Sequence, residues 1–159
     1  MKSVYLKSNI YLVDKKSFEC NPLNYKNIMN KAGKLIAQFI IENIKNIFNQ
    51  KIIVLAGPGN NGGDAMIAHY YLLKYNINSS LILFDKSQTS NWFFKKYVKD
   101  LSSFKYYREI DKFNSNNYYL DAIFGIGLNK KLNKKYLDAI NSFHDFKNII
   151  SVDIPSGIY

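Results

Sequence analysis

Short, continuous apolar runs alternate along this chain with longer segments whose apolar residues recur at helical spacing. The clearest run, KIIVLA at residues 51–56, stops at a Gly-Pro-Gly turn, which is typical of a strand buried on both faces of a sheet. Strands that alternate with helices predict βαβ units and a parallel sheet covered on both faces. We therefore expect an α/β fold, a three-layer Rossmann-like domain with a mostly parallel sheet.

The same periodicities place the individual elements. We expect strands at residues 51–56, 80–84, 118–124 and 148–154, and a short edge strand is left open within 105–117. The expected helices cover residues 22–49, 63–75, 91–104 and 132–143. The first helix opens at Asn21-Pro22, where Asn would be the N-cap and Pro the first helical residue.

Length and composition indicate one globular domain, which we expect to span residues 1–159. No apolar run approaches the roughly 18 residues that a membrane-spanning helix needs. The N-terminus also lacks the continuous apolar segment of a secretory signal. The single cysteine, Cys20, excludes an internal disulfide framework and fits a reducing compartment. We expect a cytoplasmic protein without a membrane partner.

The formal net charge of +10 raises the question of a nucleic-acid surface. The lysines are scattered, and no basic stretch is interleaved with aromatic residues as in an RNA-binding motif. Abundant Lys, Asn, Ile, Tyr and Phe would also follow from AT-biased coding alone. We do not expect a nucleic-acid partner, whereas an anionic dinucleotide would be attracted by the positive field.

Polar, glycine-rich segments follow three of the expected strands. They are GPGNNGGD at 57–64, DAIFGIG at 121–127 and DIPSG at 153–157. Ligands of open α/β sheets bind outside the carboxyl ends of the strands, and a parallel sheet brings those ends to one edge. The sequence therefore predicts a ligand site where these three segments meet.

The first segment contains Gly57-x-Gly59-x-x-Gly62, and Asp85 follows the next strand. This spacing matches the dinucleotide-binding pattern, in which the acidic residue takes a ribose hydroxyl. Two features depart from the usual binding mode: the amides of Asn60 and Asn61 in the tight turn, and the carboxylate of Asp64, which would repel a pyrophosphate. A P-loop is excluded because Asp64 stands where Lys-Ser/Thr is required.

Two further carboxylates, Asp121 and Asp153, lie within apolar runs that we expect to be buried. A buried carboxylate needs a hydrogen-bonding partner or a cation, so these two residues are hard to explain as solvated surface. His69 and His144 lack metal-ligand spacing, and we assign them structural roles. Cys20 has no His or Asp nearby in the sequence and receives no catalytic role.

At these residues the chain closely resembles the N-terminal domain of the YjeF family, the NAD(P)H-hydrate epimerases. The family's GPGNNGGDG stands here as 57–65 with Ala65 last, its DALFGTGL as 121–128, and its (A/S)VDIPSG as 151–157. The segment at 28–33 resembles the family's LMExAG, with Asn30 in place of the acid. The motifs occur in family order, and the resemblance covers nearly the whole chain.

The resemblance implies a substrate site, a cation and a catalytic group. Substrate contacts are expected from Asn60, Asn61, Gly62, Gly63, Asp64, Gly125, Ile126, Gly127, Leu128, Asn129, Lys130, Lys131 and Asp153. A potassium ion is expected on Asn61, Asp121 and Ser156, whose hard oxygen donors suit an alkali cation. Epimerisation at the hydroxyl-bearing ring carbon requires proton transfer. We assign this transfer to Asp153, with Asp64 in reserve.

The resemblance implies an isomerase that interconverts the R and S forms of hydrated NADH and NADPH (NADHX and NADPHX) in nicotinamide-nucleotide repair. A separate NAD(P)HX dehydratase would consume the product, and a homodimer is left open. The chain departs from the family at Ala65 and in the basic segment 129–131. It also stops two residues after DIPSG, from which we expect a C-terminally shortened sheet.

Three alternatives to the epimerase remain open at this stage. A YjeF-like RNA-associated scaffold without epimerase chemistry would fit the charge, although it would not need both NNGGD and DIPSG. An inactive truncated remnant would fit the short C-terminus. An ordinary NAD-dependent oxidoreductase has only the glycine pattern and Asp85 in its favour, and no substrate domain is evident.

Overall fold

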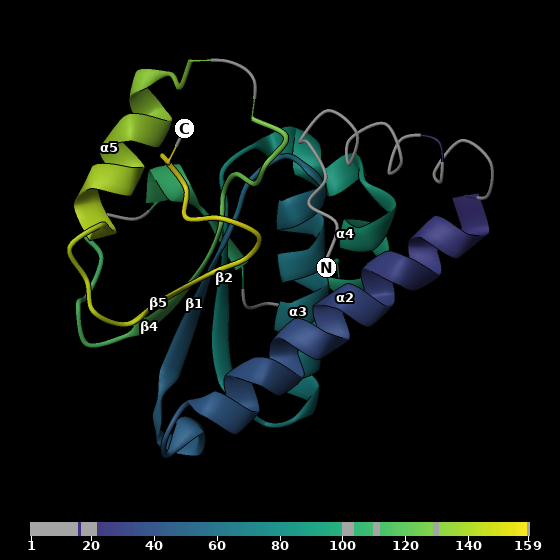
Figure 1. The fold of residues 1–159 in the computed structure, drawn as a ribbon, viewed down its shortest axis with the longest axis horizontal. Coiled ribbons are helices and arrows are strands. Elements are labelled where there is room, and N and C mark those ends of the chain that lie inside the picture. The colour runs from purple at the N-terminus through teal and green to yellow at the C-terminus, as the bar shows by residue number, and fades with distance from the viewer. Residues whose placement is uncertain (1–15, 17–21, 100–103, 110–111, 129–130, 159) are drawn as a thin grey trace, which may run out of the picture.

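The computed structural model describes residue 16 and residues 22–99, 104–109, 112–128 and 131–158. Its strands form one sheet in the order β3-β2-β1-β4-β5, and each neighbouring pair is parallel (Figure 1). The strands are β1 Lys51–Ala56, β2 Asn78–Leu83, β3 Phe104–Tyr106, β4 Tyr118–Ala122 and β5 Ile149–Ser151. The parallel sheet expected from the sequence is confirmed.

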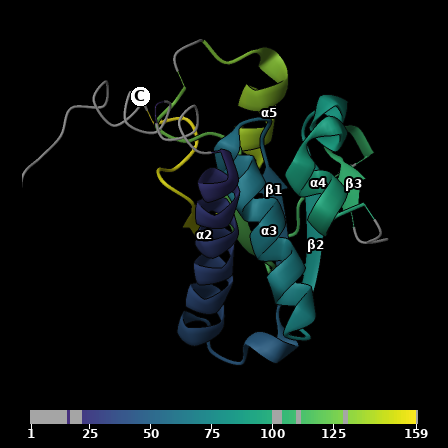
Figure 2. The same ribbon diagram turned by 90° about the vertical axis from the view of Figure 1, so that its right-hand side faces the viewer.

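Helices cover both faces of this sheet. The α-helices with described bounds are α2 Pro22–Asn43, α3 Asn60–Lys74, α4 Trp92–Tyr97 and α5 Lys134–Phe143. Figure 2 shows α2, α3 and α4 side by side in front of the sheet, with α5 behind it. Two apolar cores correspond to these faces, one beneath α2, α3 and α4 and the other beneath α5. The expected three-layer α/β, Rossmann-like architecture is therefore confirmed.

β1 lies at the centre because its side chains are apolar on both faces. Val54 packs into the core beneath α2 and α3, and Leu55 packs into the core beneath α5. Both are fully buried. Burying a side chain of this size contributes about 1.5–3 kcal/mol, so the run KIIVLA specifies a two-sided strand.

The strand order also defines where the chain reverses direction across the sheet. From β1 the chain moves outward to β2 and β3 on one side, and then returns to build β4 and β5 on the other side. The loops after β1 and β4 therefore diverge from each other at the carboxyl end of the sheet. The place where these loops diverge is the topological switch point at which open α/β sheets bind ligands.

The first helix is shorter than the sequence predicted. It ends at Asn43 and not at Asn49, because Asn46 adopts a left-handed conformation with φ 54°. A separate 3-10 helix, Ile47–Asn49, then leads into β1. The predicted cap Asn21 lies outside the described residues.

The second helix is longer than predicted at its start. It begins at Asn60, three residues before the expected Gly63, and the N–H of Gly63 already bonds to the Gly59 carbonyl at 3.1 Å. Asn61 therefore stands in the first helical turn and not in the preceding loop. The following strand runs from Asn78 to Leu83, so the predicted 80–84 was displaced by one to two residues.

The predicted helix 91–104 was too long. α4 ends at Tyr97, and Phe104 is the first residue of β3, paired with Leu81. This short strand lies at the start of the stretch that the sequence left ambiguous, and it forms an edge of the sheet. Residues 100–103 lie outside the described part of the chain.

Three of the predicted elements on the β4–β5 side were also too long. β4 ends at Ala122, and β5 covers only Ile149–Ser151. Shortly after β5, Asp153 has φ 70°, which an extended strand does not accommodate. The last helix begins at Lys134 and not at Leu132, because Asn133 is its N-cap.

Candidate active site

Asn61 connects three segments at the carboxyl end of the sheet. Its amide nitrogen donates to the carbonyl of Phe124 at 3.0 Å and to the carbonyl of Val152 at 3.2 Å. The loop after β4 supplies the first acceptor and the loop after β5 the second. The first turn of α3 is thereby joined to both loops, and the structure brings together the three polar segments that the sequence placed at one edge.

Asp121 and Ser156 form the buried part of this site. The backbone N–H of Ser156 donates to one carboxylate oxygen at 2.7 Å, and its hydroxyl donates to the other at 2.6 Å. Asp121 is only 2% exposed. Burial raises the pKa of its carboxyl, and the hydrogen bonds from Ser156 oppose that rise. The Ser156 hydroxyl lies 3.5 Å from the Phe124 carbonyl, the same oxygen that Asn61 contacts.

Asp153 lies at the surface of the site, in the left-handed region with φ 70°. Its carboxylate accepts the N–H of Ile126 at 2.6 Å, which fixes the start of the loop after β4. A β-carbon on Gly125 would lie 2.5 Å from the same carboxylate oxygen. A side chain at position 125 would therefore displace the Asp153 carboxylate from its present place, and the strained backbone of Asp153 is typical of a functional position.

Asp64 provides the second carboxylate that a ligand could meet. It stands in the second turn of α3, and its Oδ1 atom is buried without a hydrogen-bond partner. Burial raises the pKa of Asp64 from 3.8 to about 7. A carboxyl with this pKa exchanges protons near neutral pH, the range in which general acids and bases are most effective.

The glycine-rich segment 57–62, which leads into the first turn of α3, is packed closely at two positions and open at a third. A β-carbon on Gly57 would overlap the carbonyl of Ile123, and one on Gly62 would overlap the carbonyl of Gly57. A β-carbon on Gly59 would meet nothing within 4 Å. The turn is thus held against the loop after β4, while Gly59 leaves room for a ligand to approach the backbone.

The remaining predicted substrate residues are distributed around this centre. Gly127 and Asn60 are exposed, and the N–H of Leu128 closes a turn on the Gly125 carbonyl at 3.1 Å. Lys131 is exposed in the segment before α5. The predicted contacts Asn129 and Lys130 lie outside the described residues.

Asp85 has a structural task that the glycine-pattern argument did not anticipate. Its carboxylate accepts the N–H of Ser87 at 2.8 Å, and its own N–H donates to the Gln88 side chain at 2.8 Å. This capping box begins the 3-10 helix Lys86–Ser90. The D-x-x-Q spacing in the sequence is the signal by which this cap could have been recognised.

Sequence reasoning also missed two contributors to the site, the backbone carbonyls of Phe124 and Val152. Neither side chain is polar, so no residue type marks these oxygens.

Within the described residues, no three His, Cys, Asp or Glu side chains gather as they would around a transition metal. The oxygens near Asn61 are instead amide, hydroxyl, carboxylate and carbonyl, which are ligands for hard cations.

No helix in the described part of the chain is long and apolar enough to cross a membrane. The strand order and the polar centre at its switch point define a Rossmann-like α/β domain in which polar groups gather between the loops after β1 and β4. Among such domains, the family described as YjeF-related protein N-terminus matches residues 25–159, and the chain belongs to this family.

Individual relatives agree with this assignment. The chain is 33% identical over 142 residues to the bifunctional NAD(P)H-hydrate repair enzyme Nnr of Dictyoglomus turgidum, covering 82% of this chain and 27% of that protein. It is 32% identical over 137 residues to an NAD(P)H-hydrate epimerase of Paramecium tetraurelia, covering 82% and 57%. The chain therefore spans less than two thirds of either relative.

A solved structure supports the fold. The crystal structure of yeast ynu0 superposes on this chain with a TM-score of 0.79, covering 98% of this chain and 72% of the yeast chain at 22% identity. The likeness confirms the arrangement of helices and strands described above.

Proposed function

We propose that this chain is an NAD(P)H-hydrate epimerase, an isomerase that interconverts the R and S forms of hydrated NADH and NADPH. The observation that carries the proposal is the convergence of Asn61, Asp121 and Asp153 at the switch point of a chain that belongs to the YjeF family. The names of its relatives support the same activity. The reaction would repair damaged nicotinamide dinucleotides.

We further propose that a potassium ion binds at Asn61, Asp121 and Ser156. The donor set fits an alkali cation, because a flip of the Asn61 amide would turn its oxygen toward the carbonyls of Phe124 and Val152. The buried Asp121 carboxylate would supply the charge that balances the ion. The cation would orient the polar groups of the substrate, and it takes no proton itself.

Asp153 is our candidate for the proton transfer at the ring hydroxyl. It is exposed to an incoming substrate, and the Ile126 N–H holds one of its oxygens in place. The Asp153 side chain is therefore fixed, and so is the position of its other oxygen. General acid–base catalysis requires a group that is positioned in this way. Asp64 competes for this role, since its raised pKa of about 7 suits a proton exchange at neutral pH.

The chemistry also implies a partner reaction. Epimerisation alone leaves the ring hydrated, so a separate dehydratase must remove the water from the S form. The single cysteine of the chain suits the reducing cytoplasm, where we place this repair.

The deciding experiment follows R-to-S equilibration of purified NADHX by chromatography, with and without the purified protein. We expect the protein to accelerate equilibration above the spontaneous rate in proportion to its concentration. Asp145→Asn is a matched control, because Asp145 is an exposed carboxylate paired with His144 in the turn after α5. Equal rates with and without folded wild-type protein would overturn the proposal and favour an inactive remnant or a binding scaffold.

A further inference from the structure

A second polar cluster lies beside the site, at the carboxyl ends of β2 and β3. Asp85 follows β2, Arg108 follows β3, and Lys135 comes from the first turn of α5. The hydrogen bond from Ser87 is the largest cause of a lowered pKa at Asp85, and the charges of Lys135 and Arg108 lower it further. Two cations around one carboxylate leave this end of the sheet positively charged.

Hydrogen bonds connect this cluster to the glycine-rich turn. The Gln88 side chain, 1% exposed, donates to the Gly57 carbonyl at 2.6 Å and accepts the N–H of Asp85 at 2.8 Å. One buried side chain thus joins the end of β1 to the end of β2. Asp85, in the charged cluster, is therefore linked through Gln88 by two hydrogen bonds to Gly57, in the glycine-rich turn of the candidate site.

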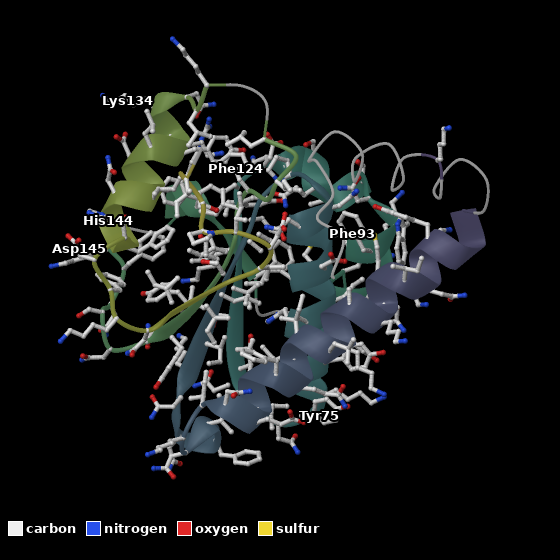
Figure 3. All side chains as sticks on the ribbon, in the orientation of Figure 1. Tyr75, Phe93, Phe124, Lys134, His144 and Asp145 are labelled. Atoms are coloured by element: carbon white, nitrogen blue, oxygen red, sulfur yellow. The ribbon has the colours of Figure 1, made fainter. Side chains whose placement is uncertain are left out.

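Aromatic contacts make a second connection, through the loop after β4. The backbone N–H of Phe124 donates to the Ser156 hydroxyl oxygen at 3.0 Å, and the Phe124 ring lies 4.8 Å from that of Tyr136. Tyr136 stacks on Phe84 at 5.5 Å, and Lys135 donates to the Phe84 carbonyl. Figure 3 shows Phe124 beside the start of α5, which Lys134 marks, at the same end of the molecule.

The distances across the sheet suit the two halves of a dinucleotide. β1 separates β2 from β4, which places their ends about 10 Å apart at the usual strand spacing of about 4.8 Å. Dinucleotides bound at such a switch point lie across the crevice, with the adenosine ribose near the end of β2. If the hydrated ring lies at Asp153, the adenosine half extends toward Arg108 and Lys135.

The residues near the end of β2 decide which ribose fits. An acid there receives a free 2′-hydroxyl, whereas arginine accommodates a 2′-phosphate. One oxygen of Asp85 is engaged in capping. Arg108 is exposed, and the ammonium of Lys135 keeps two of its three donors after bonding Phe84. The available groups are therefore mainly donors and positive charges.

We propose that Arg108 and Lys135 bind the 2′-phosphate of the adenosine ribose, so that this chain prefers hydrated NADPH to hydrated NADH. This inference rests on the proposed function, since it places the hydrated ring at Asp153. Asp85 opposes the phosphate through its charge and sets how strong the preference is. The phosphate is bound by charge-assisted hydrogen bonds, for which the planar guanidinium of Arg108 is well suited.

The test uses fragments that lack the nicotinamide ring. Calorimetric titrations compare adenosine 2′,5′-bisphosphate, its 3′,5′ isomer and 5′-AMP on the wild-type protein. The two bisphosphates have equal charge, so a difference between them reports the position of the phosphate and not the net charge of +10. We expect the 2′,5′ isomer to bind about tenfold or more tightly than either competitor.

Variants then assign the contacts. Arg108→Ala should remove most of the 2′,5′ preference, and Lys135→Met, which removes the ammonium 5.4 Å from the centre of the Tyr136 ring, should reduce it. Lys147→Ala is the matched control, because it removes an exposed charge next to the amino end of β5. Asp85→Asn keeps the cap oxygen, and we expect it to strengthen binding of the 2′,5′ isomer by removing repulsion.

The outcomes separate this inference from the proposed function. Equal affinities for the two bisphosphates, or an unchanged preference in Arg108→Ala, would overturn the 2′-phosphate site whatever the enzyme assay shows. Weaker binding of 5′-AMP to Asp85→Asn would indicate instead that Asp85 receives a free ribose hydroxyl. A clear 2′,5′ preference in a protein that does not accelerate epimerisation would uphold the phosphate site and contradict the activity alone.

Discussion

Ser156 hydrogen-bonds both carboxylate oxygens of Asp121, one with its backbone N–H at 2.7 Å and the other with its hydroxyl at 2.6 Å. A residue in the loop after β5 thus satisfies a buried acid in β4. Leaving such an acid unpaired would cost several kcal/mol. The pairing therefore fixes the loop after β5 against the sheet, and it holds the proposed cation ligands in place before any ion arrives.

Removal of the Asp121 carboxylate should abolish any response to potassium. We expect the thermal midpoint of the wild-type protein to rise when potassium replaces sodium, because an ion that binds only the folded state stabilises it. Asp121→Ala should have a lower thermal midpoint in both salts, because loss of the hydrogen bonds to Asp121 lowers the free energy of unfolding by about 1–3 kcal/mol. The midpoint of this variant should be the same in potassium and in sodium. Scanning calorimetry of both proteins measures this. A potassium response that survives in Asp121→Ala would place the ion elsewhere.

The sequence was sufficient to predict the sheet and the edge at which the site lies. KIIVLA is apolar on both faces, which predicted a strand covered on both sides, and the alternation of elements predicted a parallel sheet. Helix ends were less predictable. α2 ends at Asn43 because Asn46 adopts a left-handed conformation. α4 ends at Tyr97, and Phe104, which was predicted to be helical, pairs with Leu81 in the folded sheet. Such long-range pairing leaves no local signal.

The glycines of the first turn should respond differently to one added methyl group. Gly57→Ala must displace the Ile123 carbonyl, and we expect a loss of about 1–3 kcal/mol in unfolding free energy. Gly59→Ala meets open space and should cost less than about 1 kcal/mol. The methyl of Gly59→Ala would instead obstruct the ligand and raise KM roughly tenfold. Urea unfolding and epimerase kinetics separate the two effects, and an unchanged KM in Gly59→Ala would remove that glycine from the site.

His69 should make the fold sensitive to acid. It is fully buried, its Nδ1 lies 2.8 Å from the Ser79 hydroxyl, and burial lowers its pKa from 6.5 to about 4. Below pH 6.5 the unfolded chain binds the proton more readily, so the contribution of His69 to stability should fall as the pH drops toward 4, by about 3 kcal/mol in total. His69→Gln should lose this slope in urea unfolding. His144→Gln, at an exposed histidine, is the control and should retain it.

Asp64 should produce the opposite pH dependence. Its pKa in the folded protein is about 7, against an ordinary value of 3.8 in the unfolded chain, so the folded state binds more protons between these values. The contribution of Asp64 to the unfolding free energy should therefore decrease as the pH rises from 3.8 to 7, by at most about 4 kcal/mol, which offsets the contribution of His69 in the wild type. Asp64→Asn imitates the protonated acid. It should match the wild type in acid and exceed it in stability above pH 7, and equal stability at both extremes would contradict the burial of this charge.

The candidate site was less completely predictable than the fold. Motif residues such as Asn61 and Asp121 could be placed at one edge because a parallel sheet brings the carboxyl ends of its strands together. Three features arise only in the folded structure: the carbonyl oxygens of Phe124 and Val152, and the burial that changes the pKa of Asp64. Backbone groups carry no residue identity, and burial depends on the packing of α2 against α3, which no single segment encodes.

Asp153→Asn tests the catalytic assignment most directly. The amide keeps an acceptor oxygen for the Ile126 N–H, so the loop after β4 should remain in place. It removes the carboxylate that would take up the proton. General acid–base groups contribute about 10²–10⁴-fold, so we expect the enzymatic rate to fall at least about 100-fold while NADP(H) binding is retained.

Asp145→Asn is the control for this variant, and Asp64→Asn tests the competing assignment of the proton transfer. Asp145 is exposed and has no contact in the candidate site described above, so its variant should keep wild-type activity. If Asp153 only anchors Ile126, Asp153→Asn should stay within about threefold of wild type, because the anchor survives the substitution. A large loss in Asp64→Asn together with a flat response at Asp153 would move the proton transfer to Asp64. The pH profile then decides independently: a rate that follows ionisation near pH 7 belongs to Asp64, whose pKa burial has raised to about that value.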